Sequence, residues 1–271
     1  MKDKVGIIGY GHVGSIMKEL FSEATIYDEI KKIGSREAIN CCRFAFVCVP
    51  TPQGENGECD TSIVEYVLNW IESDIIVLRS TVPVGFTDKF AEQTGKRIVF
   101  QPEYYGETHA HPFANPYNRS WITLGGNEID TEEVAHLYQT IFNAELVINQ
   151  VDAKTAELAK YMENNYLAAK VTFCNQFYDI AKAMGLNYNK VRETWLLDPR
   201  IGRSHTFVYP DNRGFGGSCL PKDLSSIVYQ ATELQIDVTF LQAIIDANAE
   251  YHRDDQNKGA FASIKIGRAH V

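Results

Sequence analysis

A glycine-rich turn between an apolar strand and a helix constrains the fold of this chain more than any other feature. Residues 5–8 (Val-Gly-Ile-Ile) predict a buried strand, and Gly9, Gly11 and Gly14 follow it with the spacing GxGxxG. Such glycines allow a tight turn and close approach of a pyrophosphate, while the following helix offers backbone N–H groups to the phosphates. We therefore expect a dinucleotide-binding fold. The residues expected at the pyrophosphate are Gly9, Gly11, His12, Val13 and Gly14.

An acidic residue follows the second expected strand. That strand covers residues 24–27 and ends at Asp28, about twenty positions after the first glycine of the turn. A carboxylate at this place holds the ribose 2′-hydroxyl and repels a 2′-phosphate. The sequence therefore predicts NAD rather than NADP as the cofactor, with Asp28 at its ribose. A lone GxGxxG is also compatible with a turn that binds nothing.

Alternating apolar runs and helical patterns continue over the first half of the chain. Continuous apolar runs are typical of parallel strands that are buried on both faces. The further expected strands are 44–49, 75–78, 97–100, 122–126 and 145–148, with a helix over 131–142. We therefore expect an α/β fold, with a Rossmann-type doubly wound sheet over residues 1–150.

Polar and aromatic residues follow the carboxyl ends of three of these strands. Ligands of open parallel sheets bind beyond those ends, so Thr81 is expected at the cofactor and Glu103 at the substrate or a catalytic water. The alternative for Thr81 is a hydroxyl that caps a helix or a turn. The ligand-facing residues expected at these ends are Pro50, Thr51, Thr81, Glu103, Tyr104 and Tyr105.

The second half begins with one long helix. Residues 152–184 contain neither proline nor glycine, and Gly185 is a suitable stop. A helix of this length suits a spine between domains or a dimer interface, and we expect an all-α domain over 151–257. Lys160 and Asn164 lie four residues apart on one face, where they can hold an oxyanion and orient a water. The alternative is two solvated side chains.

Residues 213–223 form a glycine-rich segment around a cysteine. Its glycines permit close contact between backbone and ligand, so Cys219 is expected on a ligand-facing loop, with Gly216 at the substrate. Lys222 is expected to favour the thiolate, which is the nucleophilic form, and Asp223 to act as a base toward a water. The alternative is that Cys219 is a small buried apolar residue.

Arg200 precedes this segment in Asp-Pro-Arg-Ile-Gly. Its planar guanidinium matches a carboxylate or a phosphate, so we expect it to anchor the substrate. A structural salt bridge is the alternative.

Charge and cysteine usage exclude several classes of protein. The 271-residue chain has a net charge of −9 and no Lys/Arg run, which argues against a nucleic-acid partner. Its start lacks the features of a signal peptide, and no apolar run is long enough to span a membrane. The six cysteines show no CxxC spacing, so we expect reduced thiols, no metal site and a cytoplasmic protein.

Taken in order, these motifs resemble the nucleotide-sugar 6-dehydrogenases, the family of UDP-glucose and GDP-mannose dehydrogenases. The resemblance covers almost the whole chain. The matching segments are the GxGxxG turn, VPTP (49–52), STVPVG (80–85), PEY (102–104), AELAKYMENNYLAAK (156–170), DPRIG (198–202) and GFGGSCLPKD (214–223).

The resemblance implies two successive oxidations of a sugar C6 alcohol to a carboxylate, with reduction of two NAD molecules. Cys219 would attack the aldehyde to give a thiohemiacetal, whose oxidation leaves a thioester. Lys160 and Asn164 would stabilise the oxyanions. A thiol supports this assignment, because a route from alcohol to acid has to hold the aldehyde before releasing it.

The resemblance also implies roles for four further residues and a partner. Asp223 would work with a water at Thr81, Lys160 or Glu103 in the proton transfers and in thioester hydrolysis. Arg200 would reach the sugar across a homodimer formed through the long helix.

Two departures from the family pattern bear on the cofactor and substrate sites. The segment between Asp28 and Phe44 is short, which predicts a trimmed adenosine side. Family members carry a further C-terminal α/β domain, so we expect residues 258–271 to be a truncated linker. Residues 266–271 (Ile-Gly-Arg-Ala-His-Val) match the translation of a sequencing-adapter string, and we expect them to be an artefact.

Several functions remain open from the sequence. UDP-glucose is the first expected substrate, followed by GDP-mannose and a UDP-N-acetylhexosamine. A non-catalytic NAD-binding or dimerisation fragment is the alternative from another class. A single-step β-hydroxyacid dehydrogenase shares the N-terminal fold and a helix lysine and asparagine, but the thiol segment argues against it.

Overall fold

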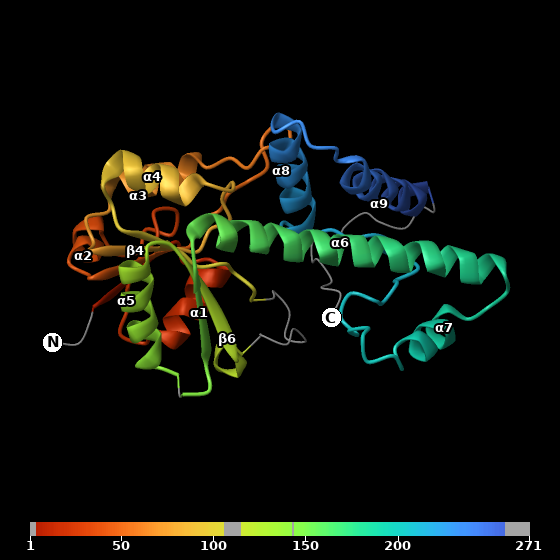
Figure 1. Ribbon diagram of the computed structural model, residues 1–271, viewed down its shortest axis with the longest axis horizontal. Coiled ribbons are helices and arrows are strands. Elements are labelled where there is room, and N and C mark those ends of the chain that lie inside the picture. Colours follow the sequence, from red (N-terminus) through yellow and green to blue (C-terminus); the bar gives the residue numbers. More distant parts are fainter. Residues whose placement is uncertain (1–3, 106–114, 143, 258–271) are drawn as a thin grey trace. The chain divides into compact units, whose positions relative to one another are not determined.

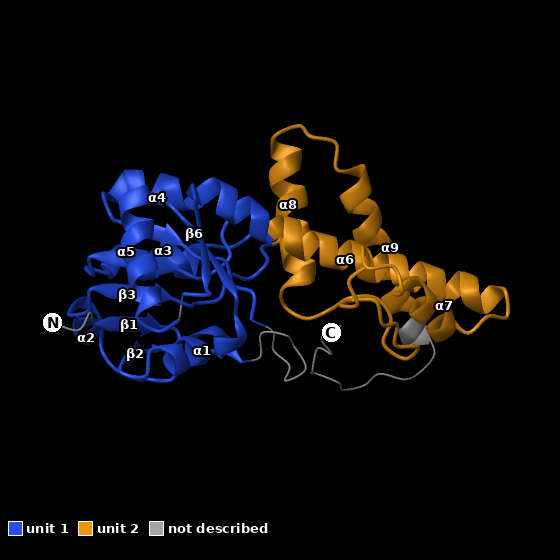
Figure 2. Ribbon diagram, turned by 60° about the horizontal axis from the view of Figure 1, so that its bottom comes forward, with its two compact units in different colours: residues 1–54, 59–160 blue, residues 55–58, 161–271 orange. Residues whose placement is uncertain are grey.

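The computed structural model describes residues 4–105, 115–142 and 144–257 (Figure 1). They divide into two compact units, and Figure 2 shows these in different colours. Unit 1 comprises residues 1–54 and 59–160, and unit 2 comprises residues 55–58 and 161–271. The expected linker and its adapter-like end, residues 258–271, lie outside the described residues.

Unit 1 contains one seven-stranded sheet, with the strand order β2-β1-β3-β4-β5-β6-β7. All neighbours are parallel except β5 and β6, which pair antiparallel through Phe100 and Gly125. The strands are β1 (Val5–Ile8), β2 (Thr25–Tyr27), β3 (Phe44–Val47), β4 (Ile75–Leu78), β5 (Ile98–Phe100), β6 (Trp121–Gly125) and β7 (Val147–Val151).

The strand order reverses at β1, whose two neighbours are β2 and β3. In doubly wound sheets the ligand crevice lies at such a switch point, beyond the carboxyl ends of the strands. A short helix, α2 (Arg36–Asn40), connects β2 to β3. β2 is the edge strand of the sheet. The short segment noted in the sequence therefore contains no further strand.

Helices cover both faces of this sheet. They are α1 (His12–Leu20), α2, α3 (Ser62–Trp70), α4 (Phe86–Thr94) and α5 (Glu128–Gln139), with a 3-10 helix η1 (Pro116–Asn118) before β6. α1 and α5 pack on one face, and α2, α3 and α4 pack on the other. Adjacent strand residues alternate between these cores: Ile7 lies in the first and Ile8 in the second. The predicted doubly wound fold is confirmed.

The expected helix over 131–142 begins and ends about three residues too late. α5 starts at Glu128 because the side chain of Asn127 accepts a hydrogen bond from the N–H of Ile129 and caps the helix. Two acidic residues in its first turn favour the same start.

In the described part of unit 2, all regular elements are helices. Its longest element is α6 (Ala153–Ala183), which confirms the predicted long helix and contributes its first turns to unit 1. The other helices are α7 (Tyr188–Trp195), α8 (Leu220–Glu233) and α9 (Thr239–Asn257). One core joins α6, α8 and α9 around Phe215, and a second joins α6 and α7 around Tyr188. Among the described residues, no helix is both long and apolar enough to cross a membrane.

Candidate active site

The glycine turn after β1 has the geometry that a pyrophosphate requires. Gly9 has a φ of +85°, and a Cβ atom on it would lie 2.6 Å from the carbonyl oxygen of Cys48 at the end of β3. A Cβ atom on Gly14 would lie 1.9 Å from the oxygen of Gly9, so only glycine allows α1 to pack this closely. A Cβ atom on Gly11, in contrast, would meet nothing within 4 Å. The backbone at Gly11 is therefore open to a ligand.

The N-terminus of α1 suits an anion. Gly11 is the N-cap residue and supplies no side-chain cap, and the first turn holds no acidic residue. Backbone N–H groups and the helix dipole favour negative charge at such a helix end. His12 is exposed at the start of α1, while the half-buried Val13 packs against the core. The residues predicted at the pyrophosphate thus fit a dinucleotide.

Asp28 is tied to this turn by hydrogen bonds. Its Oδ2 accepts from the N–H of Tyr10 at 2.7 Å, and its Oδ1 accepts from the N–H of Lys31 at 2.8 Å. Partial burial opposes ionisation, but these hydrogen bonds and the charge of Lys31 hold the pKa of Asp28 below its ordinary value. A carboxylate oxygen has a second lone pair, so Asp28 can still accept a hydrogen bond from a ribose hydroxyl.

The residues after β3 and β4 meet. The hydroxyl of Thr51 donates to the carbonyl oxygen of Thr81 at 2.8 Å, and that of Ser80 donates to Val49 O at 2.6 Å. Thr51 is buried, whereas Thr81 is half-buried and Pro50 is exposed. The structure therefore brings together Thr51 and Thr81 at the carboxyl edge of the sheet.

Glu103, which follows β5, is paired with a residue that the sequence analysis did not identify. Arg79 is only 2% exposed, and its Nη2 forms an ion pair with Oε2 of Glu103. Arg79 Nη1 also donates to Gln101 O at 3.3 Å, and the N–H of Tyr105 donates to Glu103. Burial alone lowers the pKa of Arg79, but the neighbouring Glu103 raises it above its ordinary value. An arginine directly after an apolar strand was the signal available in the sequence.

The same segment contacts Lys160 in α6. The Lys160 ammonium lies 4.5 Å from the ring centroid of Tyr104, a cation–π contact, and its side chain is buried. The Tyr104 ring also packs against Trp121, with centroids 4.9 Å apart. Three of the predicted site residues of unit 1, Glu103, Tyr104 and Lys160, are therefore brought together.

In unit 2, Cys219 is the N-cap residue of α8. It is exposed, as are Gly216, Gly217 and Ser218 before it. Gly217 has a φ of +80°, which a side chain would strain. Cys219 is thus not the small buried residue of the alternative reading, and the N–H groups of the first turn of α8 adjoin it.

Asp223 lies one turn into α8 and is almost fully buried. Asn164 Nδ2 donates to its Oδ2 at 2.5 Å, and Lys222 Nζ lies 2.6 Å from its Oδ1. The N–H of Asp223 donates to the carbonyl oxygen of Cys219 at 2.9 Å. The Lys222 ammonium is thus paired with the Asp223 carboxylate, and its expected effect on the Cys219 thiol stays a prediction.

Arg200 is held locally. Its exposed guanidinium pairs with Asp198, with Nη2 and Oδ2 2.6 Å apart. These hydrogen bonds lower the pKa of Asp198 and raise that of Arg200. Such an exposed pair leaves the guanidinium accessible to a ligand at little cost in free energy.

Two models of one protein family match this chain. The NAD binding domain of the UDP-glucose/GDP-mannose dehydrogenase family matches residues 29–142, and the central domain of the same family matches residues 154–250. The two matches follow unit 1 and unit 2 in order.

Curated relatives agree with this family. GDP-mannose 6-dehydrogenase of Pseudomonas aeruginosa is 30% identical over 224 residues, which are 76% of this chain and 50% of that protein. UDP-glucose 6-dehydrogenase of Rickettsia bellii is 29% identical over 249 residues, 86% of this chain and 56% of that protein. The chain thus spans about half the length of the curated relatives it matches.

Solved structures share the fold. A UDP-glucose dehydrogenase from Pyrobaculum islandicum superposes with a TM-score of 0.78 at 23% identity, over 92% of this chain and 68% of that chain. A UDP-D-ManNAc dehydrogenase from Pyrococcus horikoshii gives 0.77 at 20% identity, over 94% and 70%. The dinucleotide turn, the doubly wound sheet and the two family matches lead to one conclusion: this chain belongs to the UDP-glucose/GDP-mannose dehydrogenase family, and its cofactor is NAD.

Proposed function

We propose that the chain carries the catalytic machinery of a nucleotide-sugar 6-dehydrogenase that oxidises the C6 alcohol of UDP-glucose to the carboxylate. The observation that carries this proposal is the exposed Cys219 at the N-terminus of α8, one helical turn before the buried Asp223–Asn164 pair. A dehydrogenase that stops at the aldehyde has no use for a thiol at a substrate site.

The proposed reaction has four balanced steps. The alcohol loses a hydride and a proton to give an aldehyde, and NAD supplies the hydride acceptor in each oxidation. The thiolate of Cys219 adds to the aldehyde carbon, and the oxyanion takes up a proton to give a thiohemiacetal. Loss of a second hydride and a proton leaves a thioester. Water then adds to the thioester carbon and the C–S bond breaks, which releases the carboxylate, the thiol and one proton.

Within this reaction, Lys160 and Asn164 are proposed to stabilise the oxyanions, since one turn of α6 separates them and both donate hydrogen bonds. Removal of one such donor typically lowers kcat by about 10²–10³-fold. Asp223 is proposed to assist proton transfer to and from water. Its hydrogen bond from Asn164 orients the carboxylate for that role.

The residues proposed around the substrate in unit 1 are Thr81 and Glu103, with Tyr104 and Tyr105 beside them. The ion pair with Arg79 orients the carboxylate of Glu103, which suits an acceptor for a water or for a sugar hydroxyl. Asp28, Thr51 and the glycine turn are proposed to hold NAD.

UDP-glucose is proposed as the first substrate, with GDP-mannose and a UDP-N-acetylhexosamine as the alternatives. Curated relatives with nearly equal identity are named UDP-glucose 6-dehydrogenase and GDP-mannose 6-dehydrogenase. All three compounds are therefore substrates to be tested. The competing function, a non-catalytic NAD-binding fragment, offers no reason for the chain to keep Cys219, Lys160, Asn164 and Asp223.

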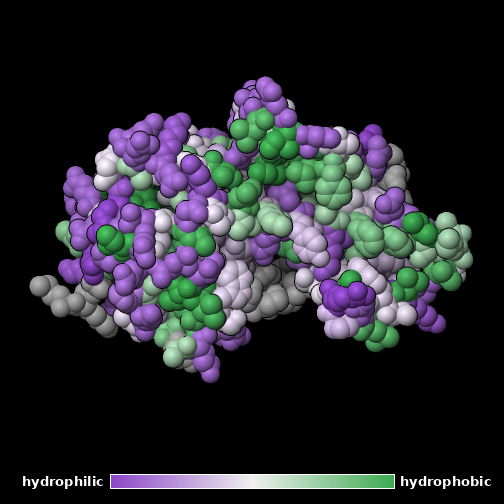
Figure 3. Space-filling model, in the orientation of Figure 1, coloured by the Kyte–Doolittle hydropathy of each residue, from purple (hydrophilic) through white to green (hydrophobic). Residues whose placement is uncertain are grey.

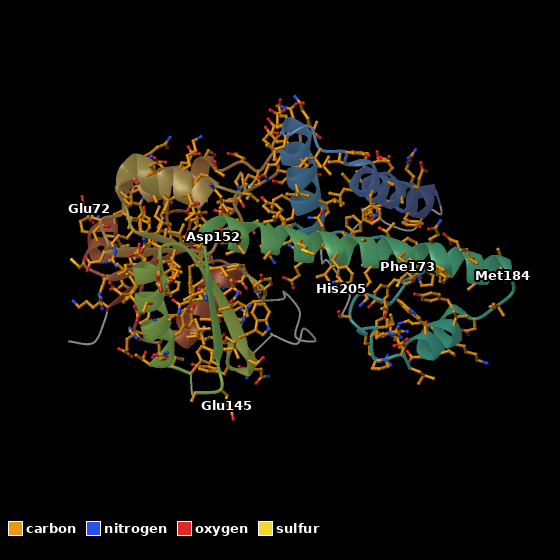
Figure 4. All side chains as sticks on the ribbon, in the orientation of Figure 1. Glu72, Glu145, Asp152, Phe173, Met184 and His205 are labelled. Carbon is orange, nitrogen blue, oxygen red and sulfur yellow. The ribbon has the colours of Figure 1, made fainter. Side chains whose placement is uncertain are left out.

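We further propose that the chain forms a homodimer through α6. One stripe of this helix carries large exposed apolar side chains at helical spacing, including Phe173 and Met184, which are labelled in Figure 4. Apolar residues are visible over the second half of α6 in the space-filling view (Figure 3). The exposed apolar residues of this stripe in unit 2 are Met162, Tyr166, Phe173, Phe177, Ile180 and Met184. A contiguous apolar surface of this kind is typical of a protein–protein interface.

A second copy is the proposed occupant because the same stripe on two copies can cover itself in a two-fold contact. Leu186 and Leu197 of the same unit are exposed as well. In such a dimer the exposed Arg200 is available to the substrate site of the partner. All six cysteines lie in the described ranges, and none of them forms a disulfide bond there, which fits the proposed location in the reducing cytoplasm.

The proposed function is tested by incubating the chain with NAD and each of the three nucleotide sugars. We expect two NADH per sugar consumed, together with a covalent sugar adduct on Cys219 after acid quenching. The Cys219→Ser variant should lose the second oxidation, whereas Cys41→Ser, which removes another exposed thiol, should match the wild type. A Cys219→Ser protein that still releases two NADH per sugar would refute the thiol mechanism.

A further inference from the structure

The base of the thiol segment is fixed by one buried arginine. Arg213 is 4% exposed, and its Nε donates to Asn175 Oδ1 at 2.6 Å. Its Nη1 and Nη2 donate to the two carboxylate oxygens of Asp179 at 2.9 and 2.8 Å. This two-pronged contact ties the segment to α6 with defined distance and orientation.

Two aromatic rings enclose the same guanidinium. The ring centroids of Tyr178 in α6 and Tyr251 in α9 lie 4.7 and 4.9 Å from its central carbon. A planar guanidinium satisfies rings and carboxylate together, which a lysine ammonium does not. Arg213 therefore joins α6 and α9 at one point.

The next two residues are held by asparagines from the same helices. Asn175 Oδ1 also accepts from Gly214 N at 3.3 Å. Asn248 in α9 accepts from Phe215 N at 2.7 Å and donates to Phe215 O at 3.0 Å. Gly214 has a φ of +75°, and a Cβ atom on it would lie 2.4 Å from Asn248 Oδ1. Residues 213–215 thus have little conformational freedom.

The four residues that follow are different. Gly216 to Cys219 are all exposed, and the first buried residue after them is Asp223. Three of the first five residues from Arg213 are glycines, which give the backbone little stiffness of its own. The exposed stretch that carries the sulfur therefore lies between two buried anchors, residues 213–215 and Asp223.

We propose that Arg213, supported by Asn175 and Asn248, is a positioning residue for Cys219. It holds the amino-terminal anchor of the thiol segment, so that the sulfur lies at a fixed place relative to the Asp223–Asn164 pair. The proposal rests on the proposed function for its catalytic consequence, but the ordering of the segment is measurable without turnover. A displacement of about 1 Å at a reacting group can lower the rate about 10²-fold.

The first test measures order directly. A nitroxide label is attached to Cys219 in the full chain in a Cys41→Ser background, and its mobility is read by electron paramagnetic resonance. Arg213→Met should increase the mobility at least about two-fold. Arg203→Met, which removes an exposed pair with Glu193 in the same unit, should leave the spectrum unchanged.

The second test separates positioning from folding. If the wild type is active, Arg213→Met should lower kcat by about 10²-fold and leave the KM values for NAD and the nucleotide sugar within about three-fold of the wild-type values. Arg213→Lys keeps the charge but not the planar guanidinium, so its kcat should lie between those of the wild type and Arg213→Met. Thermal unfolding confirms that each variant is folded.

The outcomes distinguish this proposal from the proposed function. A wild type that oxidises none of the three sugars refutes the proposed function, while the nitroxide spectra still decide the role of Arg213. Unchanged label mobility in a folded Arg213→Met protein overturns the positioning role, as does an unchanged kcat. If Arg213→Met does not fold, Asn248→Ala removes the two contacts from α9 and is expected to give the same increase in mobility.

Discussion

Glu157 in α6 caps a helix to which it is not connected in sequence. Its carboxylate accepts from the N–H groups of Gly85 at 2.5 Å and Thr87 at 3.0 Å, and its side chain is fully buried. These N–H groups begin α4, whose N-cap residue is Gly85 and offers no side chain of its own. We predict that Glu157→Ala strongly destabilises unit 1.

The size of the effect follows from the two contacts. Removal of the carboxylate leaves two N–H groups in a buried place without an acceptor, and each such group costs about 1–3 kcal/mol. The free energy of unfolding of unit 1 should therefore fall by about 2–6 kcal/mol. Lys154→Ala is the matched control, since Lys154 lies in the same turn of α6 but is exposed and 4.0 Å from Asp88. An exposed pair of this kind contributes about 0–1 kcal/mol.

The measurement is urea denaturation followed by tryptophan fluorescence. A Trp195→Phe background leaves Trp70 and Trp121 as the remaining tryptophans, and both lie in unit 1. A loss below about 0.5 kcal/mol in Glu157→Ala would show that the carboxylate does not cap α4, and the reasoning would fail.

We also expect the free energy of unfolding to depend on pH through Glu157. Burial raises the pKa of Glu157 above the ordinary value of 4.5, although hydrogen bonds from Gly85 and Thr87 oppose this. The folded protein then binds more protons than the unfolded chain above pH 4.5, so stability falls as the pH rises to the folded pKa. Glu157→Gln should lack this slope. Equal slopes in both proteins between pH 4.5 and neutrality would contradict the burial argument.

Three further predictions concern the cofactor turn, the ion pair and the dimer. Gly11→Ala should fold with wild-type stability but bind NAD at least about ten-fold more weakly in calorimetric titration. Gly14→Ala should lose stability as well, because its Cβ atom would lie 1.9 Å from a backbone oxygen. Arg79→Met should lower the free energy of unfolding by about 3–5 kcal/mol, since it leaves the carboxylate of Glu103 without its partner, and adding Glu103→Gln should restore part of the loss in thermal unfolding. Phe177→Glu should convert the proposed dimer to a monomer in light scattering, and an unchanged mass would exclude this face of α6 as the interface.

Much of the architecture could be predicted from local patterns. The glycine turn, the apolar runs and the long uninterrupted helix each depend on residues close in sequence, and the structure confirms the sheet and α6. The start of α5 was missed because a side-chain cap at Asn127 decided it. The antiparallel pairing of β5 and β6 has no local signature, because strand direction depends on how the connecting segment is routed.

The candidate site, like the fold, has features that local sequence predicts and features that depend on distant residues. The motifs predicted roles for Cys219, Asp223 and the residues after the strands, since a functional loop needs particular residue types at fixed spacing. They did not identify what holds these residues. The partners of Glu103 and Arg213 lie 24 and 38 positions away in sequence.

The sequence by itself therefore determined the fold class, the family and the chemical groups at hand, because periodicity and motif spacing are local properties of a chain. Only the tertiary structure decided which partner each buried charge meets: Arg79 with Glu103, Arg213 with Asp179, and Glu157 with the start of α4. The physical reason is that a buried charge requires a partner, and the fold, not the neighbouring sequence, selects which partner comes within hydrogen-bonding distance.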